Sequence, residues 1–348
     1  MEKDTIIKLK EMKHMKIFKK ILFTAVPLCA ALLLAGCNIN ISVTGTRVNY
    51  PNAEKYRAGE TKINDTVNEV RIHWISGGVE VLAAGDKGTR IEESGAPADE
   101  ALKLRYWLDG DTLHIQPCAS GTVYPGTLNK TLTLWLPKQS LDLVSVEGVS
   151  CDVEMTGLEA TAVSIDTVSG DAELKGCTVT EELDMDSTSG GLIASLKGAL
   201  EVLDFSTISG GAELNGCEVT DKLKMDSTSG GLSASLKGTL ELLDFSSVSG
   251  AVKLEGDEIR RVNFDTTSGA MELKLEREPE KLDMDSTSGG LSLTLPKGAD
   301  FELEFDTVSG GFKSDIPFAV DGDKYIAGDG GNLYSVSTTS GGVKISAR

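Results

Sequence analysis

The sequence predicts an all-β fold whose main part is a parallel β-solenoid, a flattened β-helix with about 20 residues in each rung. Ser-Gly pairs recur through the second half of the chain in steps of 19 to 21 residues, and a fixed period in this range is typical of repeat folds. The pairs begin at Ser169, Ser189, Ser209, Ser229, Ser249, Ser268, Ser288 and Ser309. Apolar and polar residues alternate before each pair, which is the periodicity of a β-strand.

Two inward columns support this assignment. The residue four places before each Ser is always apolar: Ile165, Met185, Phe205, Met225, Phe245, Phe264, Met284 and Phe305. Three places after the Ser, small and large residues alternate, as in Ala172, Leu192, Ala212 and Leu232. This alternation predicts that unlike rungs interdigitate in one close-packed core, so the copied unit holds two rungs and 40 residues. Glycine is expected to serve the bend after each strand.

Residues 1–36 are predicted to be a lipoprotein signal peptide. Residues 16–37 combine a basic start, an apolar run and small residues before a cleavage point. Leu34, Ala35 and Gly36 resemble a bacterial lipobox, which makes Cys37 the expected lipidation site and mature N-terminus. An ordinary signal peptide or a transmembrane anchor is the alternative, and translation could start at Met1 or Met15.

Four further segments follow the signal peptide. Residues 37–60 suit a tether, residues 61–145 an irregular β cap, residues 146–316 the solenoid repeats and residues 317–348 a pair of C-terminal capping strands. Trp74, Trp107 and Trp135 all fall in the cap region. We expect these side chains to plug the open end of the solenoid, and an aromatic platform for a glycan is the alternative.

Charge excludes some partners. The chain carries a net charge of −19, and cleavage before Cys37 leaves 27 basic and 50 acidic side chains, a net charge of −23. So acidic a protein is a poor ligand for nucleic acid or for anionic lipid. The expected membrane attachment is therefore the acyl group on Cys37, and the expected location is the bacterial cell envelope or surface.

Carboxylates dominate the outward columns of the strand before each Ser-Gly pair. The longest run is Asp265, Asp285 and Asp306, flanked by Asp283 and Glu304. Stacked carboxylates are hard-oxygen ligands, so this run is a candidate Ca²⁺ site, and no other cofactor is expected. A solvated acidic face without a metal is the alternative.

The remaining cysteines and histidines favour structural roles. Cys177 and Cys217 occupy one column two rungs apart, about 9.6 Å, which is too far for a disulfide. Cys118 and Cys151 are the other two cysteines after Cys37, and a Cys151–Cys177 pair is geometrically allowed but has no support in the repeat pattern. His73 and His114 lie in strand-like segments, and the chain has neither HExxH nor GxSxG. We therefore expect no enzymatic activity.

Residues 61–348 resemble the DUF4097 family of bacterial β-strand-repeat envelope proteins, which are often labelled adhesins. The resemblance rests on LTLWLPK at residues 132–138, DTVSGG at 306–311 and STTSGG at 337–342. It implies a β-solenoid without an established enzymatic activity and supplies no catalytic residues.

These observations favour a lipid-anchored, non-catalytic surface protein that binds a glycan or another protein. The flatter, less charged outward positions Ser195, Ser235, Ser292 and Thr294 are the expected partner surface. An envelope-stress accessory that contacts a membrane protein is the second hypothesis. A Ca²⁺-dependent polysaccharide-active enzyme is the third.

Overall fold

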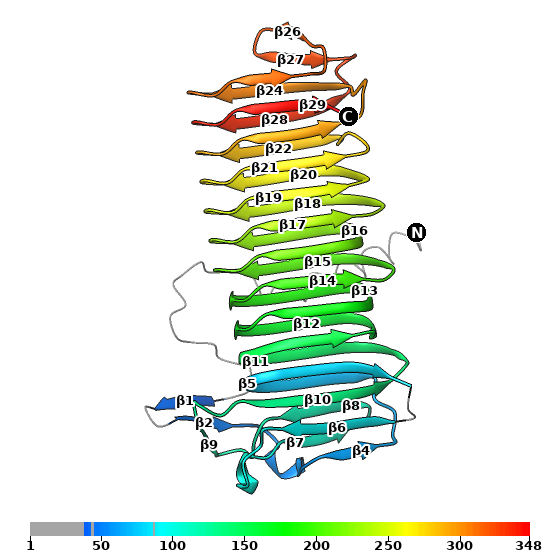
Figure 1. Ribbon diagram of the computed structural model, residues 1–348, viewed down its shortest axis with the longest axis vertical. Helices are drawn as coiled ribbons and strands as arrows, with labels where there is room; N and C mark the ends of the chain where they lie inside the picture. Colours follow the sequence, from blue (N-terminus) through cyan, green and yellow to red (C-terminus); the bar gives the residue numbers. More distant parts are fainter. Residues whose placement is uncertain (1–37, 43–44, 86–87) are drawn as a thin grey trace, which may run out of the picture. The chain divides into compact units, whose positions relative to one another are not determined.

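The computed structural model describes residues 38–42, 45–85 and 88–348, and these belong to one compact unit. Within these ranges, helical geometry is confined to two three-residue 3₁₀ segments, η1 (Ala53–Lys55) and η2 (Glu100–Leu102). No helix in this part of the chain is long and apolar enough to cross a membrane. Strands make up most of the rest (Figure 1).

The strands fall into three groups along the chain. The first group is β1 (Asn38–Ser42), β2 (Gly45–Asn49), β3 (Arg57–Ala58), β4 (Thr61–Ile63), β5 (Glu69–Ala84), β6 (Thr89–Ser94), β7 (Arg105–Asp109), β8 (Thr112–Gln116), β9 (Val123–Tyr124) and β10 (Lys130–Pro137). The second is β11 (Ser140–Thr156), β12 (Glu159–Ser169), β13 (Ala172–Ser189), β14 (Leu192–Leu196), β15 (Ala199–Thr207), β16 (Ala212–Ser227), β17 (Leu232–Leu236), β18 (Thr239–Ser247), β19 (Val252–Gly256), β20 (Glu258–Thr266), β21 (Met271–Leu275), β22 (Lys281–Ser286) and β23 (Leu291–Leu295). The third is β24 (Phe301–Thr307), β25 (Phe312–Ser314), β26 (Ala319–Asp321), β27 (Lys324–Ala327), β28 (Asn332–Thr338) and β29 (Val343–Ala347).

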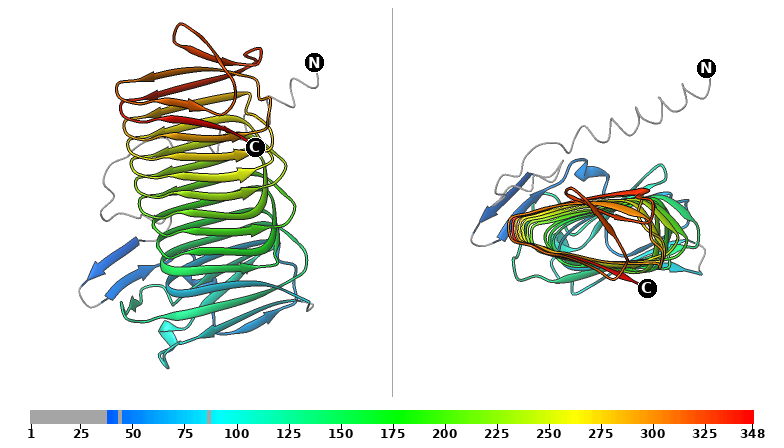
Figure 2. Two further views of the ribbon diagram at one scale, coloured as in Figure 1. Left: turned by 45° about the horizontal axis from the view of Figure 1, so that its top comes forward. Right: turned by 90° about the horizontal axis from the view of Figure 1, so that it is seen from above.

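The second group forms the predicted parallel solenoid. Met185 pairs with Phe205, Phe205 with Met225 and Met225 with Phe245, so each rung repeats the previous one in register. Seen from above, the rungs superimpose as a flattened ring with two long sides (Figure 2). The side chains of the inward columns are buried between these two sides and form one continuous core. The predicted fold class is confirmed.

The flattened ring has two outer faces, one on each long side. The first-strand face is formed by the outward residues just before each Ser-Gly turn, on β12, β15, β18, β20, β22 and the second halves of β13 and β16. The second-strand face is formed by the outward residues just after the turn, on β14, β17, β19, β21, β23 and the first halves of β13 and β16.

Glycine at the turn is required by close backbone approach. A Cβ added to Gly230 would lie 1.6 Å from the carbonyl oxygen of Gly210, and one added to Gly250 would lie 1.9 Å from that of Gly230. The same clash recurs at the turn of every rung from Gly170 onward. In this column only Gly170 has a positive φ. The expectation that glycine merely eases a bend is therefore incomplete, because the carbonyl of the neighbouring rung occupies the space of a side chain.

The parallel stack begins earlier in the chain than the sequence repeat. β5 pairs parallel with β11 and continues the stack by one rung. β8 and β10 both pair parallel with β5 and continue it further. Antiparallel pairings of β4 and β10 with β6, and of β3 and β8 with β7, then cover this end. Antiparallel strands give no 20-residue period, which is why the sequence of this region looked irregular.

A buried ion pair holds the cap together. The side chains of Lys130 and Glu93 are 0% and 4% exposed. The Lys130 ammonium donates hydrogen bonds to the Glu93 carboxylate and to the carbonyls of Leu102 and Pro117, the Leu102 bond being 2.7 Å long. Its three protons are therefore all used. Burial lowers the pKa of Lys130, and the hydrogen bond that it donates to Glu93 opposes this shift.

The three tryptophans have different environments. Trp74 is 1% exposed, and its indole Nε1 donates a 3.1 Å hydrogen bond to the Lys130 carbonyl, so it fills the core as expected. Trp107 is half-buried, with the His114 ring stacked at 4.8 Å and the Lys55 ammonium 4.4 Å from its centroid. Trp135 is half-buried beneath the Arg90 guanidinium at 3.8 Å. Because these rings carry such neighbours, they make poor platforms for a sugar.

The C-terminal strands do not close the end of the stack. β28 lies between β22 and β24, parallel to both, and β29 lies between β23 and β25 (Figure 1). The chain thus completes rung β24–β25, leaves the stack and returns to fill the position beneath it. The hairpin of β26 and β27 pairs antiparallel with the outer edge of β24 and covers it. The expectation for residues 317–348 is corrected: only this hairpin caps the end.

Gly230→Ala tests the close approach at the turn. We expect a loss of about 3 kcal/mol of unfolding free energy, because the methyl group can fit only if two rungs separate. Urea denaturation followed by circular dichroism measures the loss. Gly311→Ala is the matched control, since a Cβ there meets no atom within 4 Å. Equal stability of the two variants would show that the rungs do not approach as described.

Lys130→Met tests the buried ion pair. We expect a loss of about 3–5 kcal/mol, because the substitution leaves Glu93 buried without its cation. Thermal unfolding measures this loss, and adding Glu93→Leu should restore part of it. Lys175→Met is the control: Lys175 pairs with Glu154 and Glu173 at side chains that are 40% or more exposed, which predicts a change within about 1 kcal/mol. A Lys130→Met cost no larger than that of Lys175→Met would contradict the assignment.

Candidate binding surface

The predicted lipidation site lies outside the described residues. Leu34, Ala35, Gly36 and Cys37 all precede residue 38, so lipid attachment at Cys37 stays a prediction.

The predicted run of stacked carboxylates is interrupted. Asp265 and Asp285 are neighbours in register, but the residue that follows Asp285 in the stack is Ser337, and Asp306 comes after it. In the same way Ser335 separates Asp283 from Glu304. The expected continuous column is therefore wrong, because the C-terminal rung is inserted into it. No group of three or more carboxylate, His or Cys side chains within the described ranges is arranged to hold a metal, and Ca²⁺ binding stays a prediction.

A different carboxylate cluster lies nearer the cap on the first-strand face. Asp166 stacks on Asp186, and Asp184 stacks on Asp204. Lys224 pairs with Asp204 at 3.1 Å and with Asp226 at 2.7 Å. Within the described part of the chain, no ion pair joins Asp166, Asp184 or Asp186 to a cation.

The pKa values of these three carboxyls are raised. Burial, followed by the charge of Asp186, raises the pKa of Asp166 to about 6. Burial and then the charges of Asp186 and Asp204 raise the pKa of Asp184 to about 7. The pKa of Asp186 is raised by burial and by Asp204, and a hydrogen bond from Ser206 opposes the shift. Asp166 and Asp184 therefore take up protons closer to neutral pH than ordinary aspartates do.

His73 and His114, the histidines within the described residues, lie on β5 and β8. His73 Nδ1 lies 3.1 Å from the Glu147 carboxylate, and its ring is 6.0 Å from that of Tyr50. His114 is stacked on Trp107, and burial lowers its pKa. The cysteines Cys118, Cys151, Cys177 and Cys217 are buried and free. Burial raises the pKa of the Cys118 and Cys151 thiols to about 12, so neither is a ready nucleophile.

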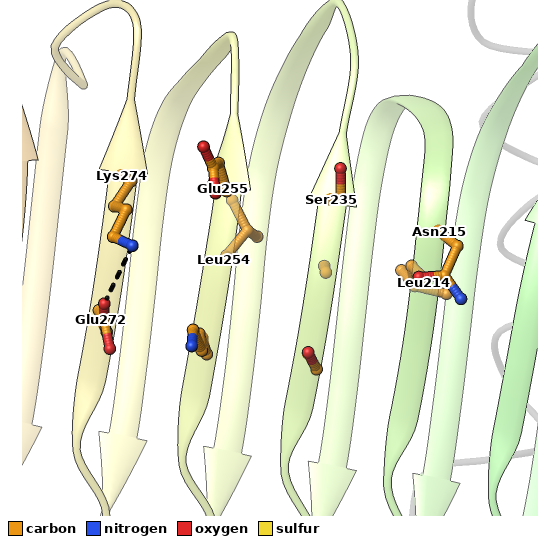
Figure 3. Close-up of a pocket in the computed structure, with 10 residues that line it drawn as sticks. Leu214, Asn215, Ser235, Leu254, Glu255, Glu272 and Lys274 are labelled. Atoms are coloured by element: carbon orange, nitrogen blue, oxygen red, sulfur yellow. Dashed lines mark ion pairs between the residues drawn. The ribbon is translucent and has the colours of Figure 1, made fainter.

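The second-strand face carries an open groove of about 170 Å³ above β16, β17, β19 and β21 (Figure 3). Ser233 and Ser235 of β17 are exposed and short, so they form its low part. Longer side chains rise on the neighbouring strands. These are Asn215, Lys253, Glu255, Glu272 and Lys274. Each alternates along its strand with a buried residue such as Leu214 or Leu254, so the solenoid core fixes its direction.

A second hollow adjoins this groove. Its volume is about 500 Å³, and Ser233 lines both spaces. Its floor is a column of small residues, Gly191, Gly211, Gly231 and Ala251, and its rim includes Ile193, Glu213 and Asp171. Ile193 is 41% exposed, whereas Leu192 and Leu232, which also line this hollow, are buried. Both spaces are open; polar and apolar atoms line the groove in similar measure, whereas mainly apolar atoms line the second hollow.

The charges in the groove are mixed. Lys274 Nζ lies 3.5 Å from the Glu272 carboxylate, as the dashed line in Figure 3 marks. Lys253 and Glu255 stand on the adjacent strand. Hydroxyl, amide, carboxylate and ammonium groups thus face one open strip, which suits a polar ligand that both donates and accepts hydrogen bonds.

Part of this surface could be read from the sequence. Ser235 was expected on the partner surface and lines the groove, whereas Ser195, Ser292 and Thr294 lie on the same face beyond its lining. Asn215, Ser233 and Lys253 also line the groove, but the sequence analysis did not predict them as part of the partner surface. A comparison of neighbouring rungs could have identified them. β17 has serines at its two outward positions, whereas β16 has Glu213 and Asn215 there and β19 has Lys253 and Glu255.

A family model described as Toastrack DUF4097 matches residues 79–346. Two crystal structures are similar to the chain. One, a "putative adhesin" from Bacteroides fragilis NCTC 9343, has 16% identity and a TM-score of 0.44, and the match covers 64% of this chain and 97% of that one. The other, a "putative cell adhesion protein" from Clostridium sporogenes ATCC 15579, has 11% identity and a TM-score of 0.18, covering 84% of this chain and 99% of that one. Similarity at this level carries no argument about function. No curated protein matches the chain.

Asp184→Asn tests the carboxylate cluster. A raised pKa in the folded state gives stability that is complete at pH 4 and is lost as the pH rises toward 7. We therefore expect the variant to be more stable than the natural protein by about 1 kcal/mol at pH 8, with the difference vanishing near pH 4. Thermal unfolding across this range measures it. Asp306→Asn, at an exposed position beside Ser337, is the control and should stay within about 0.5 kcal/mol. A destabilised Asp184→Asn at pH 8 would contradict the burial of this charge.

Proposed function

The chain belongs to the DUF4097 (Toastrack) family, and we propose that it is a non-catalytic binding protein of the bacterial cell envelope. The groove on the second-strand face is the observation that carries this proposal. In the proposed arrangement, an acyl group on Cys37 attaches the protein to the membrane, and the solenoid presents its second-strand face to a ligand.

The groove favours an extended, hydroxyl-rich polymer, that is, a surface glycan. An enclosed ligand pocket typically buries most of its ligand, whereas this groove is open and shallow and contacts only one side of a chain. Ser233, Ser235 and Asn215 offer neutral donors and acceptors, and Glu255 and Lys253 add charged ones. Sugar hydroxyls both donate and accept, so they can use all of these groups.

The repeat supports a polymer more than a compact ligand. Because the copied unit is 40 residues, the short outward side chain of Ser235 recurs two rungs earlier at Ser195 of β14, about 9.6 Å away, whereas Ile193 stands in the place of Ser233. A repeating ligand can use equivalent positions on one face, and several weak contacts on one chain add up to useful avidity.

Ser235→Trp tests this function. The indole fills the low part of the groove, and we expect the affinity for glycan to fall at least about tenfold, equivalent to 1.4 kcal/mol. A panel of purified bacterial wall polysaccharides, immobilised and probed with the full chain by biolayer interferometry, provides the measurement. Ser292→Trp is the matched control, because it lies on the same face in β23 outside the groove lining.

Two results would overturn the proposal. One is that no polysaccharide of the panel binds the unsubstituted protein. The other is that Ser235→Trp and Ser292→Trp reduce binding equally while circular dichroism shows both folded, which would place the contact elsewhere.

A further inference from the structure

The last rung of the solenoid in space is not the last rung in sequence. Rung β28–β29, residues 332–347, occupies a slot between rung β22–β23 and rung β24–β25. The segment 301–316 precedes it in the chain and is synthesised first. When residues 301–316 have just been made, residues 332–348 do not yet exist. No rung can then separate β24–β25 from β22–β23.

The two rungs that border the slot fit each other. Leu282 and Leu303 both pair with Tyr334, and Met284 and Phe305 both pair with Val336, so each pair shares one inward column. Their turns match as well. A Cβ on Gly341 would meet the carbonyl of Gly289, and one on Gly310 would meet that of Gly341. Rung β24–β25 therefore matches β22–β23 in its inward columns and at its turn.

The inserted rung pairs with a neighbouring strand along both edges, and specific side-chain contacts hold it in addition. Tyr334 is 2% exposed, stacks on Phe301 at 5.3 Å and donates a 3.2 Å hydrogen bond to the Pro279 carbonyl. Val336 and Ile345 are buried in the core. The Arg348 guanidinium pairs with Glu276 at 2.7 Å. A glycine-rich turn, with Gly328 and Gly330 at positive φ, connects the rung to the capping hairpin.

Electrostatics favours the inserted arrangement. Direct stacking would place Asp306 on Asp285 and Glu304 on Asp283, one rung apart. Each such pair of charges repels by about 0.9 kcal/mol in a water-like dielectric. Ser337 and Ser335 separate both pairs in the structure, so the inserted rung acts as a neutral spacer.

We propose that residues 332–348 form an exchangeable rung, which enters the slot after β24–β25 has formed, and that β24–β25 closes onto β22–β23 when this rung leaves. The solenoid then has two stable registers at its C-terminal end. Any event that removes or captures the C-terminal segment shortens the stack by one rung without unfolding it, and it brings Asp285 and Asp306 together.

Disulfide trapping in the full chain distinguishes the two registers. Neighbouring strands lie about 4.8 Å apart, within disulfide reach, whereas two rungs lie about 9.6 Å apart, beyond it. The Asp285→Cys/Ser337→Cys pair therefore reports insertion, and the Asp285→Cys/Asp306→Cys pair reports closure. Mass spectrometry maps the cross-links after mild oxidation.

Val336→Asp with Ile345→Asp expels the rung, because each places a carboxylate in the core. In this background we expect the 285–306 cross-link to increase about tenfold or more, and the 285–337 cross-link to be lost. Leu333→Asp is the matched control, since Leu333 lies in the same strand but is 55% exposed, and it should leave the 285–337 cross-link dominant. A dominant 285–306 cross-link in the control, or its absence after expulsion in a chain that keeps its strand signal, would overturn the proposal.

Hydrogen exchange of the unsubstituted chain provides a test that needs no destabilised variant. An exchangeable rung predicts that residues 332–348 exchange together and faster than β20 and β22, although they lie inside the stack. If these residues exchange only with global unfolding, the rung is a permanent part of the solenoid and the proposal fails.

Discussion

The close approach of successive backbones at the turn glycines is the constraint on which the rest of the structure depends. At each turn the carbonyl oxygen of one rung's glycine occupies the space where the next rung's Cβ would stand, 1.6 Å away in the case of Gly210 and Gly230. This contact fixes where a rung turns, and the strands before and after the turn then continue in register. Inward columns become continuous, so Met185, Phe205 and Met225 build one core without any helix to cover it.

How much of this could be predicted from the sequence depends on whether the information is local. The apolar columns and the Ser-Gly period specify a rung, and the rungs form as expected. The local pattern does not specify the order in which the rungs stack. The segment around Phe305 and the segment around Val336 carry the same pattern, so periodicity alone cannot tell which of them follows Met284. The choice depends on contacts distant in sequence, such as Tyr334 with Pro279 and Arg348 with Glu276. The raised pKa of Asp184 was equally inaccessible, because it arises from burial among neighbouring strands.

Exact stacking also amplifies charge. In a solenoid one residue type repeated at one position becomes a column, so an acidic position produces repulsion along the whole face. The chain limits this in three ways: Lys224 lies between Asp204 and Asp244 in one column, Ser206 and Ser246 interrupt the other, and the C-terminal rung inserts Ser335 and Ser337 near the end. Asp166, Asp184 and Asp186 are carboxyls that have no ion pair with a cation, and there burial, together with the neighbouring carboxylates, raises the pKa values.

The same geometry restricts what kind of site the fold can offer. Inward positions are used by the core, so functional groups must stand on flat faces, where a single strand of short residues between longer neighbours makes a groove but not an enclosed pocket. Ser233 and Ser235 create that difference in height on β17, and the buried Leu232, Ala234 and Leu236 hold them in place. Changing two outward serines alters the surface while the inward columns and turn glycines stay unchanged. A fold of this kind can therefore vary its binding surface by outward substitutions alone, and the repeating polymer that we propose as ligand matches a surface built from repeats.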